Sequence, residues 1–373
     1  MQFSADRQIL LDAITNISHA VAVRSTLPVL EGILMNADDE SLNLSAYNFS
    51  MGMKKTIPIN RCDEKGKTVI NARLFLEMLR RLNGDVVYIS VNSNNLCKIE
   101  SNGAEFEVIG MDASEFPEIP EVDSPIFVSF PGETLKEMVK QTIFAASTNE
   151  NAIRPILLGL YFELTENDFQ LTAIDGHKLA HRKEYVKGNE EIDFVVPAKA
   201  IGEAVKLINE ENKTVTLEVG SKYISLTING YNIITRLMEG EFLEYNQIIP
   251  KENETTFRIN TKEIINILER MSLLISDAIK TPVRVMIDEG EITFNCATAL
   301  GKATENYKAD ITGSKYEVGF NSQYMIEALK ATESDEVIIN FNGSRNPILI
   351  VPTEGDAFKY IVMPMQLRES DKQ

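Results

Sequence analysis

Two stretches of this sequence nearly repeat one another: GMDASEFPEIP at residues 110–120 and MEGEFLEYNQIIP at residues 238–250. Each has an acidic residue and a phenylalanine ahead of an Ile-Pro pair, and Phe116 and Phe242 are 126 residues apart. Self-similarity at a fixed period is strong evidence on architecture, because it means that one structural unit is built more than once. These two stretches therefore predict an internal repeat.

The repeat extends beyond these stretches and has a third copy. TLPVLEGILMNADDESLNLSA (26–46) matches RPILLGLYFELTENDFQLTA (154–173), with Pro28 and Pro155 127 residues apart. The third copy begins at Pro282, another 127 residues on, and then loses four residues in its turn. VINARLFLEMLRRL, VVPAKAIGEAVKLI and GFNSQYMIEALKAT follow in the same order. We therefore expect three domains, over residues 1–121, 127–250 and 254–373.

Within each copy the hydrophobic period alternates between that of a helix and that of a strand. Ile9, Leu10, Ala13 and Ile14 have the spacing of an amphipathic helix, whereas SLNLSAYN alternates at period two, as antiparallel strands do. The same patterns predict helices over residues 6–22, 71–83, 132–147, 198–209, 261–276 and 321–332. The expected fold class is α+β, with three repeated domains that each pack two helices on antiparallel sheet.

Composition limits the class of protein. At 373 residues with a net charge of −18, the chain suits two or three domains and should repel phosphate backbones wherever its charge is evenly spread. Cys62, Cys97 and Cys296 are odd in number and far apart, which indicates no disulfide framework and no Cys-rich metal site and fits a reducing cytoplasm. No apolar run approaches the ~18 residues of a membrane span. We therefore expect a soluble, unprocessed cytoplasmic protein with no membrane partner.

The second helix of each expected domain carries a trio of polar residues on one face, at spacings of four and three. The trios are Arg73, Glu77 and Arg80; Lys199, Glu203 and Lys206; and Gln323, Glu327 and Lys330. The six helices sum to +2 and the remainder to −20, so the helix faces are the less acidic surface. Ordinary solvated ion pairs explain any single trio. Three copies on one concave surface would instead attract a polyanion.

The threefold repeat, the helix trios and the phrases TLPVL, IDGHKL and VMPMQL together resemble the bacterial sliding clamp family, the β subunit of DNA polymerase III, over essentially the entire chain. The resemblance implies a DNA clamp fold that closes as a ring-shaped homodimer around duplex DNA, without sequence preference. It implies a non-catalytic processivity subunit of a DNA-directed DNA polymerase holoenzyme, with no cofactor and no metal. The implied partners are the replicative polymerase α subunit, the clamp loader, and other polymerases and repair proteins that carry short linear motifs.

The same resemblance implies sites, position by position. The DNA contacts fall on Arg24, Arg73, Asn151, Arg154, Pro155, Ile156 and Lys199. Pro155 and Ile156 stand where some members have aromatic residues, so stacking contacts with DNA are not expected from them. The dimer seam joins Phe106 and Val108 of one chain to Leu274 and Ile275 of the other.

The resemblance also implies a pocket for partner peptides between the second and third domains. It maps to Leu157, Ile174, Gly176, His177, Lys178, Leu179, Leu243, Gln247, Ile248, Asn321, Tyr324, Val362, Met363, Pro364 and Met365. Leu243 and Gln247 stand where some members have Pro and Arg, so the apolar floor is expected to persist while the selectivity of the rim differs. No role is implied for the terminal RESDKQ.

Asp175, His177 and His181 are the best candidates for chemistry, and they give the main alternative function. The stretch around them is expected to form two strands joined by an Asp-Gly turn, on which positions i and i+4 lie roughly 13 Å apart at ~3.3 Å per residue, too far to share a metal ion. The sequence has no G-x-S-x-G, P-loop or G-x-G-x-x-G. A hydrolase or other small-molecule enzyme with its site at Asp175 and His177 is the alternative. A three-domain adhesion protein fits the repeats but not the lack of a signal peptide pattern.

Overall fold

The computed structural model describes residues 1–149, 151, 153–186, 191–275 and 281–367. Its contacts divide the chain into two compact units, one made of Met1–Glu133 with Glu203–Leu237 and the other of Thr134–Gly202 with Met238–Gln373. The division passes through the central repeat, so each unit contains one terminal repeat and part of the central one. None of the helices in the described ranges is long and apolar enough to cross a membrane.

The described residues contain six α-helices, two for each repeat. They are α1 (Arg7–Ile17), α2 (Ala72–Arg81), α3 (Gly132–Thr142), α4 (Ala198–Lys206), α5 (Thr261–Ser272) and α6 (Ser322–Ala331). Four begin at a side chain that accepts a hydrogen bond from the first turn, namely those of Asp6, Asn71, Asn260 and Asn321. Short polar caps of this kind satisfy backbone N–H groups that have no partner inside the helix. α1 and α3 continue as single 3₁₀ turns, Ser18–Ala20 and Ile143–Ala145.

The first unit contains two antiparallel sheets. In strand order, one consists of β5 (Arg61–Glu64), β1 (Gln2–Asp6), β7 (Val86–Val91), β8 (Leu96–Ser101) and β9 (Ala104–Ile109). The other consists of β10 (Ile126–Pro131), β15 (Thr214–Val219), β16 (Tyr223–Ile228), β17 (Tyr231–Arg236), β4 (Met51–Pro58), β3 (Ser41–Tyr47), β2 (Gly32–Ala37) and β6 (Gly66–Asn71). The second sheet therefore joins strands of the first repeat to strands of the central repeat, through the pair β17 and β4.

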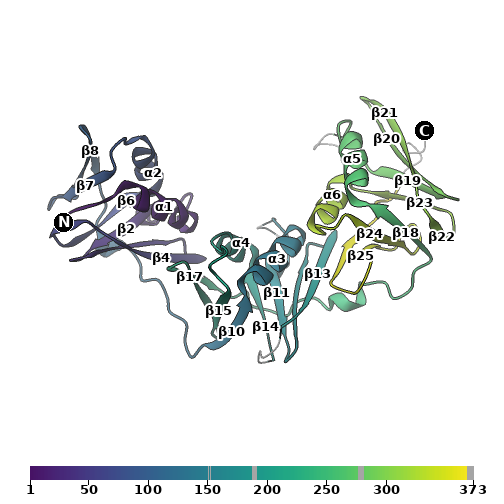
Figure 1. Cartoon of the computed structure of the whole chain (residues 1–373), viewed down its shortest axis with the longest axis horizontal. Coiled ribbons are helices and arrows are strands. Elements are labelled where there is room, and N and C mark those ends of the chain that lie inside the picture. Colours follow the sequence, from purple (N-terminus) through teal and green to yellow (C-terminus); the bar gives the residue numbers. More distant parts are fainter. Residues whose placement is uncertain (150, 152, 187–190, 276–280, 368–373) are drawn as a thin grey trace. The chain divides into compact units, whose positions relative to one another are not determined.

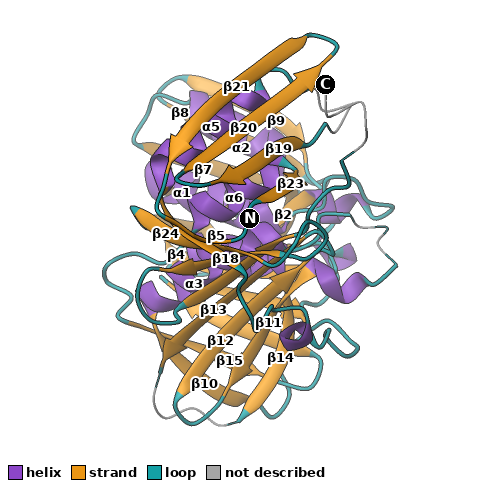
Figure 2. Ribbon diagram, turned by 90° about the vertical axis from the view of Figure 1, so that its right-hand side faces the viewer, coloured by secondary structure: helices purple, strands orange, loops and turns teal. Residues whose placement is uncertain are grey.

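The second unit also contains two sheets. One consists of β14 (Ile192–Pro197), β11 (Gly159–Leu164), β12 (Asp168–Ile174), β13 (Lys178–Tyr185), β26 (Phe358–Val362), β25 (Ile348–Pro352), β24 (Glu336–Phe341), β18 (Thr255–Asn260) and β22 (Ile311–Gly313). The other consists of β21 (Gly301–Lys308), β20 (Glu291–Thr298), β19 (Val283–Asp288) and β23 (Tyr316–Phe320), with β21 outermost beside β20 in Figure 2. The pair β13 and β26 joins the central repeat to the third.

Helices pack on one face of these sheets, and the core lies between the two layers. α1 contacts α2 in the first unit and α5 contacts α6 in the second, and each pair lies side by side in Figure 1. Phe3, Phe75 and Phe162 are fully buried side chains of this core. Gly202 of α4 packs against the 3₁₀ turn after α3, where an added Cβ would lie 2.6 Å from Ile143 Cδ1. A larger residue at position 202 would require the Ile143 side chain to shift.

The α+β class and the six helices predicted from the sequence are confirmed, with shorter ends. The predicted helix over 132–147 ends at Thr142, because Ile143–Ala145 tighten into a 3₁₀ turn and Ala146 is extended. The predicted helix over 261–276 ends at Ser272, and residue 276 lies outside the described residues, as does the RESDKQ tail. Helix ends commonly tighten in this way to satisfy their last carbonyl groups.

Candidate partner-binding site

An apolar cluster lies on the second unit where strands of the central and third repeats meet. Ile174, Leu179, Tyr245, Leu349 and Ile361 form its buried centre. Half-buried apolar side chains pack around them: Leu157, Tyr161, Phe242, Leu243, Ile248, Ile249, Val351 and Met363. These residues come from four separate parts of the chain, and a partly exposed apolar floor of this kind suits the anchor side chains of a bound peptide.

The segment 238–250, one of the two repeated stretches, crosses the sheet at this cluster. Phe242 stacks on Tyr161 with ring centroids 4.7 Å apart. Tyr245 lies 5.3 Å from the ring of His181 and donates its hydroxyl hydrogen to Glu163 Oε2 at 2.6 Å. These contacts hold Leu243 and Ile248 against the cluster, so the segment forms part of the floor.

His181 belongs to the buried support of the floor. Its Nδ1 lies 3.0 Å from the hydroxyl of Thr172. Burial lowers the pKa of His181 to about 4, and the nearby Lys359 and Lys183 act in the same direction, so the ring is neutral at pH 7. Burial also raises the pKa of the Glu163 carboxyl and of the Tyr245 hydroxyl. His181 therefore packs and hydrogen-bonds inside the protein, whereas His177 is exposed at the adjoining turn.

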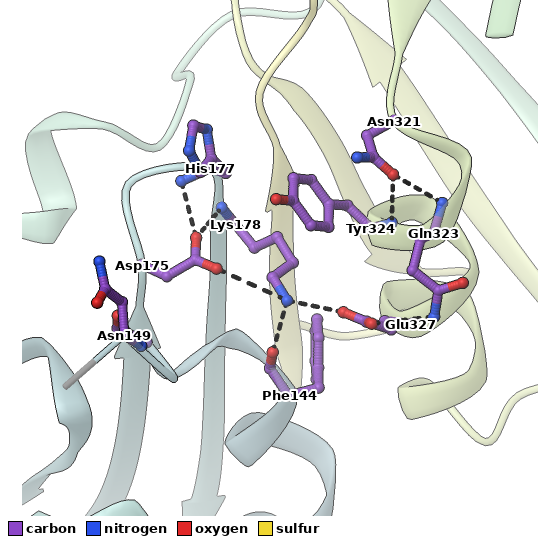
Figure 3. A network of polar contacts seen from close by, with 10 residues as sticks. Phe144, Asn149, Asp175, His177, Lys178, Asn321, Gln323, Tyr324 and Glu327 are labelled. Carbon is purple, nitrogen blue, oxygen red and sulfur yellow. Dashed lines mark hydrogen bonds and ion pairs between the residues drawn. The ribbon is translucent and has the colours of Figure 1, made fainter. Parts of the chain in front are cut away.

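The polar rim is built on the turn before β13. Asp175 Oδ1 accepts hydrogen bonds from the backbone N–H groups of His177 and Lys178, both at 2.8 Å (Figure 3). Gly176 has φ of +89°, a conformation that favours glycine. The turn presents His177 to Tyr324 of α6, and the two rings stack with centroids 5.8 Å apart. Asp175 is thus a turn-forming residue here, with its Oδ1 engaged by backbone.

A cavity of about 680 Å³ adjoins this rim. It is lined by Ser147, Thr148, Asn149, Asn151, Ile153, Arg154, Leu157, Asp175, His177 and Tyr324. Residues expected at the peptide pocket and residues expected at DNA therefore share one cavity. A second cavity, of about 840 Å³, is lined by Pro364 and Met365 together with β23 and Arg345.

The structure brings together most of the residues expected at the pocket. The apolar cluster contains Leu157, Ile174, Leu179, Leu243, Ile248 and Met363. His177 and Tyr324 stack beside it, Asn321 caps α6, and Gln247 is exposed on the 3₁₀ turn Tyr245–Gln247. Val362 is fully buried, while its neighbours Ile361 and Met363 belong to the cluster.

Two of the expected site residues have buried side chains. The side chain of Lys178 is 8% exposed, and its ammonium is held by Glu327 and the Phe144 carbonyl. Ile156 is 7% exposed, so its side chain is buried. Both lie beside exposed residues, and sequence position alone does not show which way a side chain points.

Several floor residues were missed by the sequence reasoning. They are Tyr161, Phe242, Tyr245, Ile249, Leu349, Val351 and Ile361. A signal for three of them was present, because Phe242, Tyr245 and Ile249 belong to the repeated stretch 238–250. Leu349 and Val351 lie on β25, in the sequence ILIVP. Their alternation indicates that they share one face of the strand, but it does not show what packs on that face.

The basic residues expected at DNA are exposed. Arg24 follows the 3₁₀ turn after α1, Arg73 lies in the first turn of α2, and Lys199 in the first turn of α4. Among the helix trios, Glu77 pairs with Arg80 at 3.4 Å and Lys206 with Glu203 at 2.8 Å. In these two trios the acidic residue pairs with the basic residue three positions later, and Arg73 and Lys199 lie at the other end of the trio.

The residues expected at the dimer seam lie on two separate features. Phe106 and Val108 are half-buried on β9, and Leu274 and Ile275 are half-buried just after α5. The preceding Leu273 is 80% exposed, which makes it the most exposed apolar residue of that segment. Sequence reasoning did not single out Leu273, although it continues the same apolar run.

The described residues hold no group of three or more His, Cys, Asp or Glu arranged to bind a metal ion. Asp175 caps its own turn and His181 is buried against Thr172. These contacts explain both residues structurally.

Comparisons with known proteins cover almost the entire chain. Three family models match in order: the DNA polymerase III beta subunit N-terminal domain over residues 1–120, its central domain over 129–244 and its C-terminal domain over 246–366. The chain is 30% identical to the beta sliding clamp of Halalkalibacterium halodurans, over 98% of this chain and 100% of the relative. Solved structures with TM-scores of 0.91 include a DNA polymerase III beta subunit from Eubacterium rectale (28% identity, 98% of this chain and 99% of that one) and the DNA polymerase sliding clamp from Bacillus subtilis (27%, 99% and 100%).

Proposed function

This chain belongs to the DNA polymerase III beta subunit family, the beta sliding clamps, and on that premise we propose that two copies close head to tail into a ring that encircles duplex DNA. As a member of the family it is a sliding clamp of DNA replication, a processivity subunit and not a catalytic one. We also propose that the chain has three domains, over residues 1–121, 127–250 and 254–373, and that the ring carries sites for DNA, for partner peptides and for the second copy.

Strand order is the observation that carries the ring proposal. β17 pairs with β4, and β13 pairs with β26, so the same kind of joint is built twice within one chain. By the 127-residue repeat, β9 is equivalent to β17 and β26; β21 is equivalent to β4 and β13 after the four-residue loss. Among the described strands, β9 and β21 each end a sheet. They are the two unused halves of a third joint, which a second copy would complete.

Three other sheet edges, those of β6, β14 and β23, carry backbone contacts from neighbouring segments of the chain. Met111 bridges to Val69 of β6, Met365 bridges to Gly319 of β23, and the N–H of Met238 donates to Val195 of β14 at 2.9 Å. An uncovered strand edge pairs readily with another chain, and proteins usually block such edges. A long edge left open at each end of the repeat series therefore supports pairing between copies.

Both internal joints have the same register, and this predicts the register of the seam. At one position the opposed residues are Gly52 with Ile234 and Leu179 with Ile361. The equivalent residues of β9 and β21 are Glu107 and Lys302. Opposite charges directly across an antiparallel pair stabilise it by roughly 0.2–1 kcal/mol. We therefore predict an ion pair at each seam where the internal joints have apolar contacts or glycine.

The proposed partners are the replicative polymerase, the clamp loader, and other polymerases and repair proteins with short linear motifs. The apolar cluster around Ile174, Leu179 and Ile361 supports this, because Leu and Phe anchors of an extended peptide fit such a floor. The stacked His177 and Tyr324 would flank the bound peptide. We further propose that the protein encircles duplex DNA and acts in the reducing cytoplasm.

Retention on circular DNA tests the proposed function. Protein loaded by a clamp loader onto a closed circle should stay bound through gel filtration, and should be released when the circle is linearised. A ring explains both outcomes, because topology and not affinity holds the DNA. Equal retention on linear and circular duplex would contradict enclosure.

Neutralising Arg24, Arg73 and Lys199 together to alanine is expected to impair loading and retention without changing sequence preference. Each lost phosphate contact lowers the slope of log affinity against log salt by about 1. The measurement is retention on nicked circles across a salt series. A control variant with Lys67, Lys222 and Lys251 neutralised, all exposed and outside the helices, should behave as wild type. An unchanged salt slope in the first variant would exclude these three residues as the DNA contacts.

A further inference from the structure

Lys178 is a buried cation at the junction of three elements of the second unit. Its ammonium lies 2.8 Å from the carbonyl oxygen of Phe144, 2.7 Å from Glu327 Oε2 on α6, and 3.6 Å from Asp175 Oδ2 (Figure 3). The Lys178 side chain is 8% exposed and Glu327 is 31% exposed. The ammonium thus links β13, the 3₁₀ turn after α3, and α6.

The same ammonium also fixes the aromatic part of the rim. It lies 4.9 Å from the ring centroid of Tyr324, within the range of a cation–π contact. The Tyr324 ring also stacks on His177, the residue before Lys178. Glu327 is one helical turn after Tyr324 and accepts a second hydrogen bond, from Gln323 Nε2 at 3.0 Å. The Lys178–Glu327 ion pair therefore lies directly beside the Tyr324 ring and its stack with His177.

We propose that Lys178 is a positioning residue for the partner pocket: its ion pair with Glu327 holds α6 against the Asp175–Lys178 turn, so that Tyr324 and His177 are stacked before a peptide arrives. This inference depends on the proposed peptide pocket and adds a residue that acts on it without touching the peptide. A preformed rim raises affinity because less ordering is needed on binding.

Single and double substitutions of the ion pair can distinguish a positioning role of Lys178 from a purely stabilising one. Removing one partner leaves an unpaired buried charge and destabilises the protein, whereas replacing both partners with apolar residues of similar size often restores stability. The double replacement does not restore a cation under Tyr324 or a directional contact to α6. Stability and peptide affinity should therefore respond differently to the second substitution.

The experiment compares Lys178→Met with the double variant Lys178→Met/Glu327→Leu. Binding of a polymerase-derived peptide is measured by fluorescence anisotropy, and stability by thermal unfolding. We expect Lys178→Met to lower the unfolding midpoint and to weaken binding roughly tenfold, as when the competent fraction falls to about a tenth. In the double variant the midpoint should recover while the affinity stays low. Recovery of both together would overturn the positioning role and leave a purely structural one.

A spectroscopic readout follows the geometry directly. The chain has three histidines, so their ring C–H resonances are few and can be assigned by substitution. In wild type the His177 resonances should show the ring-current shift of Tyr324, and in both variants they should lose it. His177 resonances that stay shifted in Lys178→Met would contradict the proposal.

Lys183→Met is the matched control, because Lys183 lies on the same strand and pairs with Asp168 at 3.2 Å. It should bind peptide as wild type does. If Lys178→Met does not fold, Glu327→Gln, which keeps an oxygen acceptor for the ammonium, should fold and weaken binding about threefold, and wild-type affinity in it would refute the proposal. If wild-type protein itself fails to bind the peptide, the proposed pocket fails; if it binds and Lys178→Met binds equally, only the positioning role fails.

Discussion

Replacing Leu274 and Ile275 together with aspartate is expected to convert the dimer to monomers. Burying such apolar side chains across a seam contributes on the order of 1.5–3 kcal/mol each. Losing both, with two charges placed at the interface, weakens each seam by about two to four powers of ten in dissociation constant. Leu273, 80% exposed after α5, should add to the same effect when replaced. Sedimentation at micromolar concentration measures the result.

The strand register allows a sharper version of this test. Glu107→Lys and Lys302→Glu should each weaken the dimer, because each puts like charges opposite one another. The double exchange Glu107→Lys/Lys302→Glu should restore the dimer, since the pair is re-formed with reversed sign. Phe127→Asp serves as control, because Phe127 is 65% exposed on β10, in a sheet that contains neither β9 nor β21. A Leu274/Ile275 variant that stays dimeric would mean that the seam lies elsewhere. Failure of the double exchange to rescue would mean a different register.

Repetition explains why so much of the fold could be predicted from the sequence. Asn71 and Asn321 cap equivalent helices, and Pro28, Pro155 and Pro282 open equivalent copies, so each local pattern could be checked against two others. The expected residues of the pocket floor, Leu157 and Met363 among them, came from the family resemblance alone, and the structure packs both against the apolar cluster. Agreement among the three copies therefore supports each assignment of a helix or strand without any three-dimensional information.

The sequence does not show which polar residues, far apart along the chain, form ion pairs or hydrogen bonds with one another. The resemblance placed Lys178 in the pocket but did not show its partner, Glu327, which is 149 residues away and pairs with it in the structure. Tyr245 and Glu163 are 82 residues apart and form a hydrogen bond that supports the floor. Neither partner has a local signal, because the benefit of each pair exists only after β13, β26 and α6 have packed together.

Deleting Met363 to Gln373 is expected to abolish polymerase and loader binding together while the dimer persists. Met363 belongs to the apolar cluster, and its N–H donates to the His177 carbonyl at 2.9 Å, so the deletion removes part of the floor and one support of the rim turn. Loss of anchoring contacts of this kind costs ~2 kcal/mol or more, which is at least about 30-fold in affinity. Binding of a polymerase-derived peptide and sedimentation of the same sample measure the two properties.

Two further variants separate the pocket from the end of the chain. Deleting residues 368–373 alone leaves every described residue in place and should leave peptide binding unchanged. Met363→Ala keeps Met365 bridged to Gly319, so the edge of β23 stays covered and stability is protected. It should still weaken binding, because the floor loses a thioether that adapts to different anchors. Unchanged peptide affinity in a folded dimer that lacks residues 363–373 would refute this location of the pocket. Joint loss of peptide binding and dimer would instead show that the segment supports the fold, and Met363→Ala would then decide whether it also contacts partners.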